Sequence, residues 1–379
     1  MRKKETLRQQ AMRRGMIDLP FLILTLLLMF SGLVMLFSAS YARAYAENGN
    51  AAYFFIRQAG FAAFGIVVVL AVTRVPVQWI RKASMPLLIV SLFLLVAVLA
   101  FGTEEKGATR WIKLFGISFQ PSEITKLAVV LTFAALISGY GDKMKTFYYG
   151  VMPFSAILTV VFLLLALEPH LSCIIIIGAT GAAMMFMGGT RCRWFVLLGI
   201  IAVIGLLLYL RFRGYASERI TAWRDPESDP ADSGYQILQS LYAIGSGGLW
   251  GLGLGKSRQK YLYLPFQYND YIFAVICEEL GLVGAMAIVA LFAVTILRGY
   301  WIALNARDRF STVFAAGLVT LIAVQTILNL CVVTNLLPST GIALPFFSYG
   351  GTALAVNLGE MGIVLGISRG RNRRKIQEA

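Results

Sequence analysis

Long apolar runs separated by short charged segments dominate the chain. A helix needs about 20 apolar residues to cross the hydrocarbon core of a bilayer. Eight runs bounded by charged or histidine residues have this character: Leu19–Ala39, Gln58–Thr73, Ala83–Thr103, Leu127–Gly141, Thr146–Leu167, Leu171–Thr190, Trp194–Leu210 and Leu280–Leu297. We expect the fourth helix to begin earlier, near Pro121, and the eighth near Asp270. A last stretch, Phe310–Gly359, carries no charge, and turn residues at 337–341 divide it into two helices.

This pattern predicts an all-α integral membrane protein with about ten transmembrane helices, forming one membrane domain over residues 1–379. Basic residues give the orientation, because Lys and Arg accumulate on the cytoplasmic side. With the N-terminus inside, the tails and inner loops hold 21 of the 34 Lys and Arg. Both termini are therefore predicted to be cytoplasmic. The expected parts are a basic tail (1–18), helices one to seven (19–210), a large extracytoplasmic loop (211–269), helices eight to ten (270–368) and a second basic tail (369–379).

Composition and charge restrict the function. The chain is 58% hydrophobic and 14% charged, whereas soluble domains carry about 25% charged residues. Its net charge of +15 follows the topology pattern, so no nucleic-acid partner is expected. With the single histidine His170 and four cysteines without CxxC spacing, neither a His-based zinc cluster nor a Ser-His-Asp triad nor a disulfide framework is indicated. Fourteen of the 19 acidic residues lie outside or at membrane depth, so carboxylate chemistry belongs on the outer face.

Asp270 is the first candidate for that chemistry. It lies where the long outer loop becomes helix eight, at the expected outer boundary of the membrane. Partial burial there would raise the pKa of its carboxyl group towards that of a useful general base. The same position also suits an aspartate that caps the helix N-terminus. Position alone leaves both interpretations open.

Four further charges are expected inside the membrane. Glu278 and Glu279 follow within helix eight, where each buried charge costs about 2.5–3.5 kcal/mol and needs a partner or a water-filled pocket. Glu123 and Lys126 lie three residues apart on one face of helix four, so a structural salt bridge is the simplest interpretation.

Two outer segments could bind an anion. Arg110, Trp111 and Lys113 suit either an anionic lipid-linked ligand or an ordinary interfacial anchor. The glycine-rich segment 245–257 is no phosphate-binding P-loop, because Trp250 stands where that motif requires glycine. Its backbone N–H groups could still bind an anion, or the segment could be a packed turn.

Several motifs in a fixed order together resemble the SEDS family, which contains FtsW, RodA and SpoVE. They are Gly107–Lys113, Phe119–Ala128, Gln239–Gly248, Ser257–Pro265, Asn269–Val275, Glu278–Gly281 and Leu344–Gly351. The resemblance covers nearly the whole chain. The Ser-Ala-Ser sequence at 38–40, Glu218–Ile220 and Trp223–Pro226 are most similar to FtsW or SpoVE.

The resemblance implies a peptidoglycan glycosyltransferase that polymerises lipid II, a polyprenyl-pyrophosphate-linked disaccharide-pentapeptide, with a class B penicillin-binding protein transpeptidase and other divisome proteins as partners. The catalytic aspartate of the family falls on Asp270. Substrate-binding candidates are Arg110, Trp111, Lys113, Gln239, Ser240, Ser246, Lys256, Gln259, Lys260 and Ser348. No prosthetic group is expected, although Mg²⁺ or Mn²⁺ could assist together with the substrate pyrophosphate, and no protein metal site is predicted.

Two features leave alternatives. His170 and Asn269 replace residues usual in the family, which makes a role for position 170 doubtful and changes the polar surroundings of Asp270. A lipid II flippase lined by intramembrane charges, or a non-catalytic scaffold for the transpeptidase, would also be compatible with a membrane protein of this kind.

Overall fold

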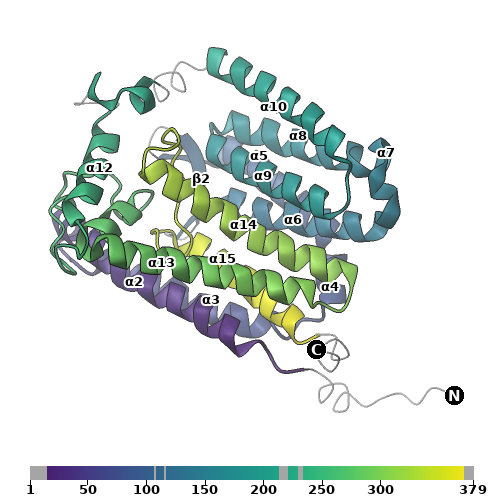
Figure 1. The fold of residues 1–379 in the computed structure, drawn as a ribbon, viewed down its shortest axis with the longest axis horizontal. Coiled ribbons are helices and arrows are strands. Elements are labelled where there is room, and N and C mark those ends of the chain that lie inside the picture. The colour runs from purple at the N-terminus through teal and green to yellow at the C-terminus, as the bar shows by residue number, and fades with distance from the viewer. Residues whose placement is uncertain (1–14, 106–107, 115–116, 213–220, 229–233, 371–379) are drawn as a thin grey trace.

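Apolar helices make up most of the computed structural model, which describes residues 15–105, 108–114, 117–212, 221–228 and 234–370 (Figure 1). In chain order the elements are α2 (Leu19–Asn48), α3 (Tyr53–Val72), α4 (Val77–Lys82), α5 (Ser84–Phe101), β1 (Thr103–Glu105), β2 (Ala108–Leu114), β3 (Ile117–Phe119), α6 (Pro121–Tyr140), η1 (Gly141–Lys145), α7 (Phe147–Gly150), α8 (Met152–Leu167), α9 (Leu171–Met187), α10 (Cys192–Phe212), η2 (Pro226–Ser228), α12 (Tyr235–Gly247), α13 (Ile272–Leu304), α14 (Arg309–Val333) and α15 (Gly351–Ser368).

The helices confirm the membrane fold predicted from the apolar runs. Within the described residues, eight helical segments are long and apolar enough to span a bilayer. Two shorter apolar helices, α9 and the first part of α10, coincide with the sixth and seventh predicted crossings. The last apolar stretch divides into α14 and α15 across residues 334–350, as its turn residues indicate.

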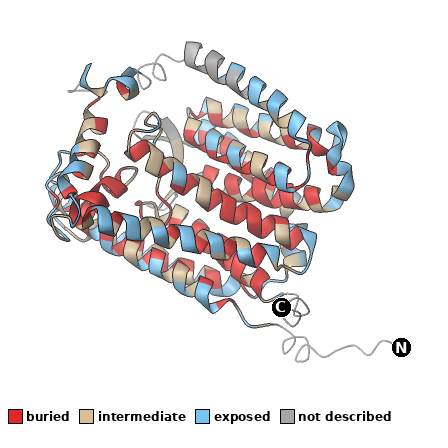
Figure 2. Cartoon of the chain, in the orientation of Figure 1, coloured by how far each residue is buried: buried red, intermediate tan, exposed pale blue. Residues whose placement is uncertain are grey.

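Helix α14 occupies the middle of the bundle, in contact with α6, α9 and α13, while α15 packs mainly against α3 (Figure 1). Figure 2 shows α14 mostly buried, whereas outer helices such as α2 and α13 expose one face. Those faces are apolar: Phe30 of α2 is 55% exposed and Leu297 of α13 is 68% exposed. A bundle with apolar side chains on its outside is suited to a lipid solvent rather than to water.

A small sheet departs from the purely helical expectation. Strands β1, β2 and β3 form a three-stranded antiparallel sheet between α5 and α6. The register pairs Thr103 with Trp111, and Ile112 with Phe119. The sheet orders the connection that carries Arg110 and Trp111 and brings it beside the first turn of α6.

Helix α13 is interrupted at Gly281, whose φ of 67° and ψ of −172° are not helical. The break frees backbone groups, and buried backbone groups without partners are costly. The loop after α12 supplies partners: Leu252 N–H and Gly253 N–H donate to the carbonyls of Glu278 and Glu279, and Gly248 O accepts from Leu282 N–H. A Cβ on Gly251 would lie 2.2 Å from Glu279 O, so this close approach requires glycine.

The start of α2 and the end of α15 meet on one side of the bundle, at the opposite end from α12 (Figure 1). Asp18 caps α2 through Phe21 N–H and receives a bidentate ion pair from Arg298 near the end of α13. Its own N–H donates to Ser368 Oγ at the end of α15. Asp18 therefore joins the start of α2 to α13 through its carboxylate and to α15 through its backbone.

Candidate active site

Asp270 lies two residues before α13. The residue at the N-cap position of this helix is Tyr271, and its side chain makes no capping hydrogen bond. Asn329 of α14 donates from Nδ2 to Asp270 O (2.8 Å) and to Ile342 O (2.6 Å). Asn329 is fully buried, and it joins the segment that carries Asp270 to the loop between α14 and α15.

That loop supports the neighbouring residues as well. Ser348 Oγ donates to Asn269 O (2.6 Å) and accepts from Leu344 N–H. Tyr349 N–H donates to Tyr268 O (2.8 Å). Ser348 was predicted to bind substrate. Its side chain is only 7% exposed, and its hydrogen bonds hold the backbone beside Asp270. These bonds fix the position of Asp270 before any ligand binds.

The carboxylate of Asp270 faces a hollow of about 150 Å³ among α6, α9, α14 and the sheet connection. Gly341, with φ of 68°, lies directly beside it: a Cβ there would be 3.3 Å from Asp270 Oδ2. Five residues predicted from the sequence line this pocket, namely Arg110, Trp111, Glu123, Lys126 and Asp270. The fold has brought residues 110–126 together with Asp270, which lies more than 100 residues later along the chain.

Lys126 Nζ and Glu123 Oε2 form a buried ion pair of 2.9 Å, as their spacing predicts. Lys126 Nζ also donates to Gln325 Oε1 (2.9 Å), and Gln325 Nε2 donates to Ala343 O (3.0 Å). Lys126 is therefore held between an acidic partner and an amide that reaches the α14–α15 loop. Because these groups also line the pocket, the pair has a structural role and at the same time forms part of a cavity wall.

Arg110 donates to two backbone carbonyls in the α8–α9 turn, Glu168 O and Pro169 O. Burial raises the pKa of the Glu168 carboxyl group to about 8, and nearby Arg110 opposes this shift. Burial, together with the positive charges of Arg110 and Lys126, lowers the pKa of His170 well below its ordinary value. At neutral pH, Glu168 is thus mostly protonated and His170 is neutral.

Sequence reasoning missed three side chains at this site: His170 and Gln325 line the pocket, and Asn329 holds Asp270. The departure of His170 from the family pattern makes a role for it doubtful from the sequence, whereas the structure places it at the pocket wall. Gln325 and Asn329 are polar residues in the long uncharged stretch 310–359. A signal was present, since buried polar residues in an apolar helix need partners.

The remaining substrate-binding candidates lie away from this hollow. Lys113 is exposed on β2, and Gln239 is partly buried on α12. Ser240 Oγ donates to Val333 O (2.9 Å), joining α12 to the end of α14, and Ser246 Oγ donates to Ala243 O within α12. Lys256 and Gln259 belong to the loop that follows α12, where Lys256 is exposed.

Glu278 and Glu279 obtain the partners that their buried positions require. Glu279 accepts from Ser38 Oγ (2.6 Å), Gly255 N–H (3.0 Å) and Ser257 N–H (3.3 Å). Glu278 accepts from Arg258 N–H (2.9 Å), Gln259 N–H and Ser257 Oγ. The glycine-rich loop therefore does bind anions through its backbone, but the anions are the carboxylates of α13.

Lys260 belongs to the same cluster. Its ammonium is 2.7 Å from Glu279 Oε1, lies over the Tyr41 ring and has no exposed surface. In this structure Lys260 consequently compensates a buried carboxylate instead of facing the pocket around Asp270. The cluster fastens the loop to α2 and α13.

Comparisons with known proteins agree with this arrangement. A family model described as "Cell cycle protein", that of FtsW, RodA and SpoVE, matches residues 18–373. A relative from Geobacter sulfurreducens, called probable peptidoglycan glycosyltransferase FtsW, is 40% identical over 93% of this chain and 95% of its own length. Stage V sporulation protein E of Bacillus subtilis is also 40% identical, over 93% of this chain and 97% of its own.

Solved structures show the same fold. A chain from a peptidoglycan synthase complex, described as coordinating polymerization and crosslinking, superposes with a TM-score of 0.78 at 26% identity, covering 93% of this chain and 98% of that chain. The rod shape determining protein RodA of Thermus thermophilus gives a TM-score of 0.70 at 25% identity, covering 94% and 97%. Since one family model spans almost the whole chain and relatives reach 40% identity, this protein belongs to the FtsW/RodA/SpoVE family.

Proposed function

We propose that this protein is a peptidoglycan glycosyltransferase that polymerises lipid II, with Asp270 as its general base. The observation that carries the proposal is the position of Asp270 at the wall of a pocket that Arg110 and Lys126 also line. A base beside fixed cations suits a reaction in which a hydroxyl loses a proton while a pyrophosphate departs. The relatives called peptidoglycan glycosyltransferases support the same activity.

In the proposed reaction, Asp270 accepts the proton of the acceptor sugar's 4-hydroxyl group as that oxygen attacks the anomeric carbon of the donor. The bond between this carbon and the lipid pyrophosphate breaks, and its electron pair leaves with the pyrophosphate. Attack from the opposite side converts the α linkage into a β linkage. Arg110 at the pocket wall would neutralise charge on the departing group. The pyrophosphate linkage supplies the activation, so no nucleotide is needed.

A divalent cation would assist mainly through the substrate. Within the described residues, no three or more His, Cys, Asp or Glu side chains gather as a metal site. In the pocket, Glu123 is engaged with Lys126, which leaves Asp270 as the carboxylate best placed to contribute a ligand. Mg²⁺ usually binds through one or two carboxylates plus substrate phosphates, so Mg²⁺ or Mn²⁺ held chiefly by pyrophosphate oxygens fits this site.

We further propose that the pocket faces the outer side of the bacterial plasma membrane and that both termini are cytoplasmic. The supporting observation is the distribution of Lys and Arg along the sequence, because 21 of the 34 fall in the tails and loops predicted to be cytoplasmic. A class B penicillin-binding protein is the proposed partner, consistent with the similarity to a chain of a complex that couples polymerization to crosslinking. The similarity to relatives named FtsW and SpoVE supports a role for this protein in peptidoglycan synthesis at a division or sporulation septum, together with other divisome proteins.

Purified protein, combined with its transpeptidase partner in detergent and given labelled lipid II, tests the activity. Detergent removes sidedness, so flipping alone produces no polymer. We expect glycan ladders from the native protein and a rate lower by about 10²–10⁴-fold for Asp270→Asn, the usual effect of losing a general base. Asp225→Asn, which removes an exposed carboxylate remote from the pocket, serves as the matched control and should retain activity.

Each alternative function has a distinct outcome. Ladders that persist in Asp270→Asn would remove Asp270 from the mechanism. A folded complex that makes no ladders, yet moves lipid II between the leaflets of a vesicle, would identify a flippase. Neither activity, with intact binding of the transpeptidase, would identify a scaffold.

A further inference from the structure

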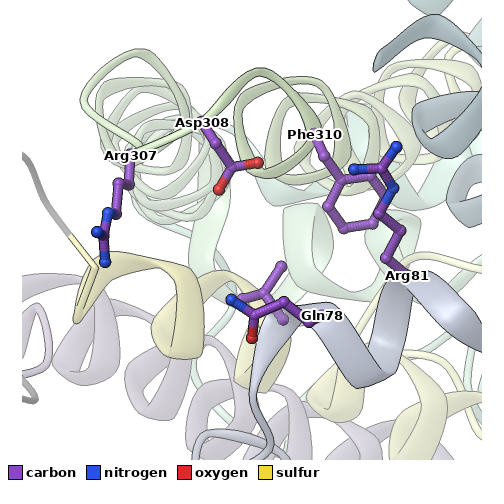
Figure 3. Close-up of a pocket in the computed structure, with 6 residues that line it drawn as sticks. Gln78, Arg81, Arg307, Asp308 and Phe310 are labelled. Atoms are coloured by element: carbon purple, nitrogen blue, oxygen red, sulfur yellow. The ribbon is translucent and has the colours of Figure 1, made fainter. Parts of the chain in front are cut away.

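A second hollow lies at the opposite end of α13 from Asp270. It has a volume of about 400 Å³ and lies between the short helix α4 and the turn that joins α13 to α14. Figure 3 shows Arg81 and Arg307 on opposite sides of this space, with Gln78 and Asp308 between them. Helix α13 lies between the two hollows, and no residue lines both of them. This pocket therefore plays no direct part in the chemistry at Asp270.

The two guanidinium groups make the pocket suitable for an anion. Arg81 lies over the ring of the buried Phe310, with its Cζ 5.5 Å from the ring centroid, so its direction is partly fixed. Among the described residues neither Arg81 nor Arg307 forms an ion pair. The planar fork of arginine matches the oxygens of a phosphate group.

Asp308 adjusts the net charge of the site. Its carboxylate caps α14, accepting from Ser311 N–H (3.1 Å) and Ser311 Oγ (2.8 Å). Two guanidinium groups and one engaged carboxylate leave a net charge of +1. That charge matches a phosphodiester, which carries one negative charge, better than a free phosphate, which carries nearly two near neutral pH.

Exposed apolar side chains lie close along the chain to the residues that line the pocket. Trp79 on α4 is 68% exposed, with Lys82 Nζ 5.6 Å from its ring centroid, an arrangement typical of the membrane–water interface. Leu304, the last residue of α13, is 72% exposed. Val77 and Phe310 add apolar surface inside the pocket. A ligand held here would have its phosphate beside the arginines and apolar chains beside Trp79 and Leu304.

We propose that this pocket binds the phosphodiester headgroup of an anionic membrane lipid, with Arg81 and Arg307 on the phosphate and Gln78 beside the remainder of the headgroup. Basic pockets between helices at a membrane surface bind such headgroups in other membrane proteins. The bound lipid would fill the gap between α4 and the α13–α14 turn.

Native mass spectrometry of the full-length protein, with phosphatidylglycerol or phosphatidylcholine added in equal amounts, tests the proposal. Both lipids contain a phosphodiester, but only phosphatidylglycerol has a net negative charge. We expect the wild-type protein to retain phosphatidylglycerol roughly tenfold more strongly, because the quaternary ammonium of phosphatidylcholine would lie beside two guanidinium groups and be repelled by them. The Arg81→Gln/Arg307→Gln variant should lose this preference. Arg81→Lys/Arg307→Lys, which keeps the charge but loses the fork, should fall between them.

A matched control separates the pocket from general surface charge. Lys145→Gln/Arg191→Gln removes two positive charges at the same end of the bundle but outside the pocket, and should retain the preference. Equal losses in both double variants, or an unchanged preference in Arg81→Gln/Arg307→Gln, would overturn the proposal. So would displacement of phosphatidylglycerol by inorganic phosphate or glycerol phosphate at equal concentration, since the site would then bind a free anion. Circular dichroism and size-exclusion chromatography verify that each variant is folded.

Discussion

The buried pair Lys260–Glu279 predicts an asymmetric response to mutation. Glu279 has four donors around its carboxylate: Ser38 Oγ, the N–H groups of Gly255 and Ser257, and Lys260 Nζ at 2.7 Å. The ammonium of Lys260 has fewer partners, namely Glu279, Ser38 Oγ at 3.3 Å and the face of the Tyr41 ring. When Glu279 is removed, the buried ammonium of Lys260 therefore keeps fewer partners than the carboxylate of Glu279 keeps when Lys260 is removed.

The structure gives approximate magnitudes. Glu279→Gln leaves a buried ammonium without a carboxylate, and breaking a buried pair in this way costs about 3–5 kcal/mol. Lys260→Met leaves Glu279 with three hydrogen bonds from the loop and α2, so its cost should approach that of one hydrogen bond to a charged group, about 1.5–3 kcal/mol. Lys260→Met/Glu279→Gln should cost less than the sum, because the two residues share one interaction. The exposed pair Arg43–Glu47 is the control: Glu47→Gln should change stability by less than about 1 kcal/mol.

Two measurements examine this prediction in the detergent-solubilised protein. The apparent melting temperature, followed by tryptophan fluorescence, should fall most in Glu279→Gln, less in Lys260→Met and hardly at all in Glu47→Gln. Limited trypsin digestion should cleave after the exposed Arg258 faster in the two cluster variants, because the loop is no longer held by α13. An equal or larger effect of Lys260→Met, or unchanged cleavage at Arg258, would refute the reasoning.

Two further predictions concern the pocket around Asp270. Because burial raises the pKa of Glu168 from 4.5 to about 8, the folded protein binds a proton that the unfolded chain releases, and stability should fall as the pH rises from about 4.5 to 8. Glu168→Gln should weaken this fall, measured as the apparent melting temperature between pH 5 and 9. A pH profile identical to that of the wild-type protein would contradict the raised pKa of Glu168. Gly341→Ala places a methyl group 3.3 Å from Asp270 Oδ2 at a φ of 68°, where a residue with a side chain costs roughly 1–2 kcal/mol. Lipid II polymerisation by Gly341→Ala should be slower while the protein stays folded. An unchanged rate would show that Gly341 does not confine the carboxylate of Asp270.

Local features determined much of what the sequence could predict. Apolar runs bounded by charges indicated the crossings because a bilayer core tolerates few charges, and the resulting helices lie where those runs occur. The spacing of Glu123 and Lys126 predicted their ion pair, since residues three apart share one face of a helix. The ordered motifs indicated the family, because they preserve residue identities that no composition argument requires.

Only the tertiary structure decided which of these residues meet. Position alone left Asp270 as either base or helix cap, and the loop between α14 and α15, more than 70 residues later, is what places it at a pocket. The glycine-rich loop proved to bind the carboxylates of Glu278 and Glu279, and Lys260 proved to be their counter-ion. Such outcomes depend on long-range packing and on satisfying every buried polar group at once, and no local sequence pattern contains that information.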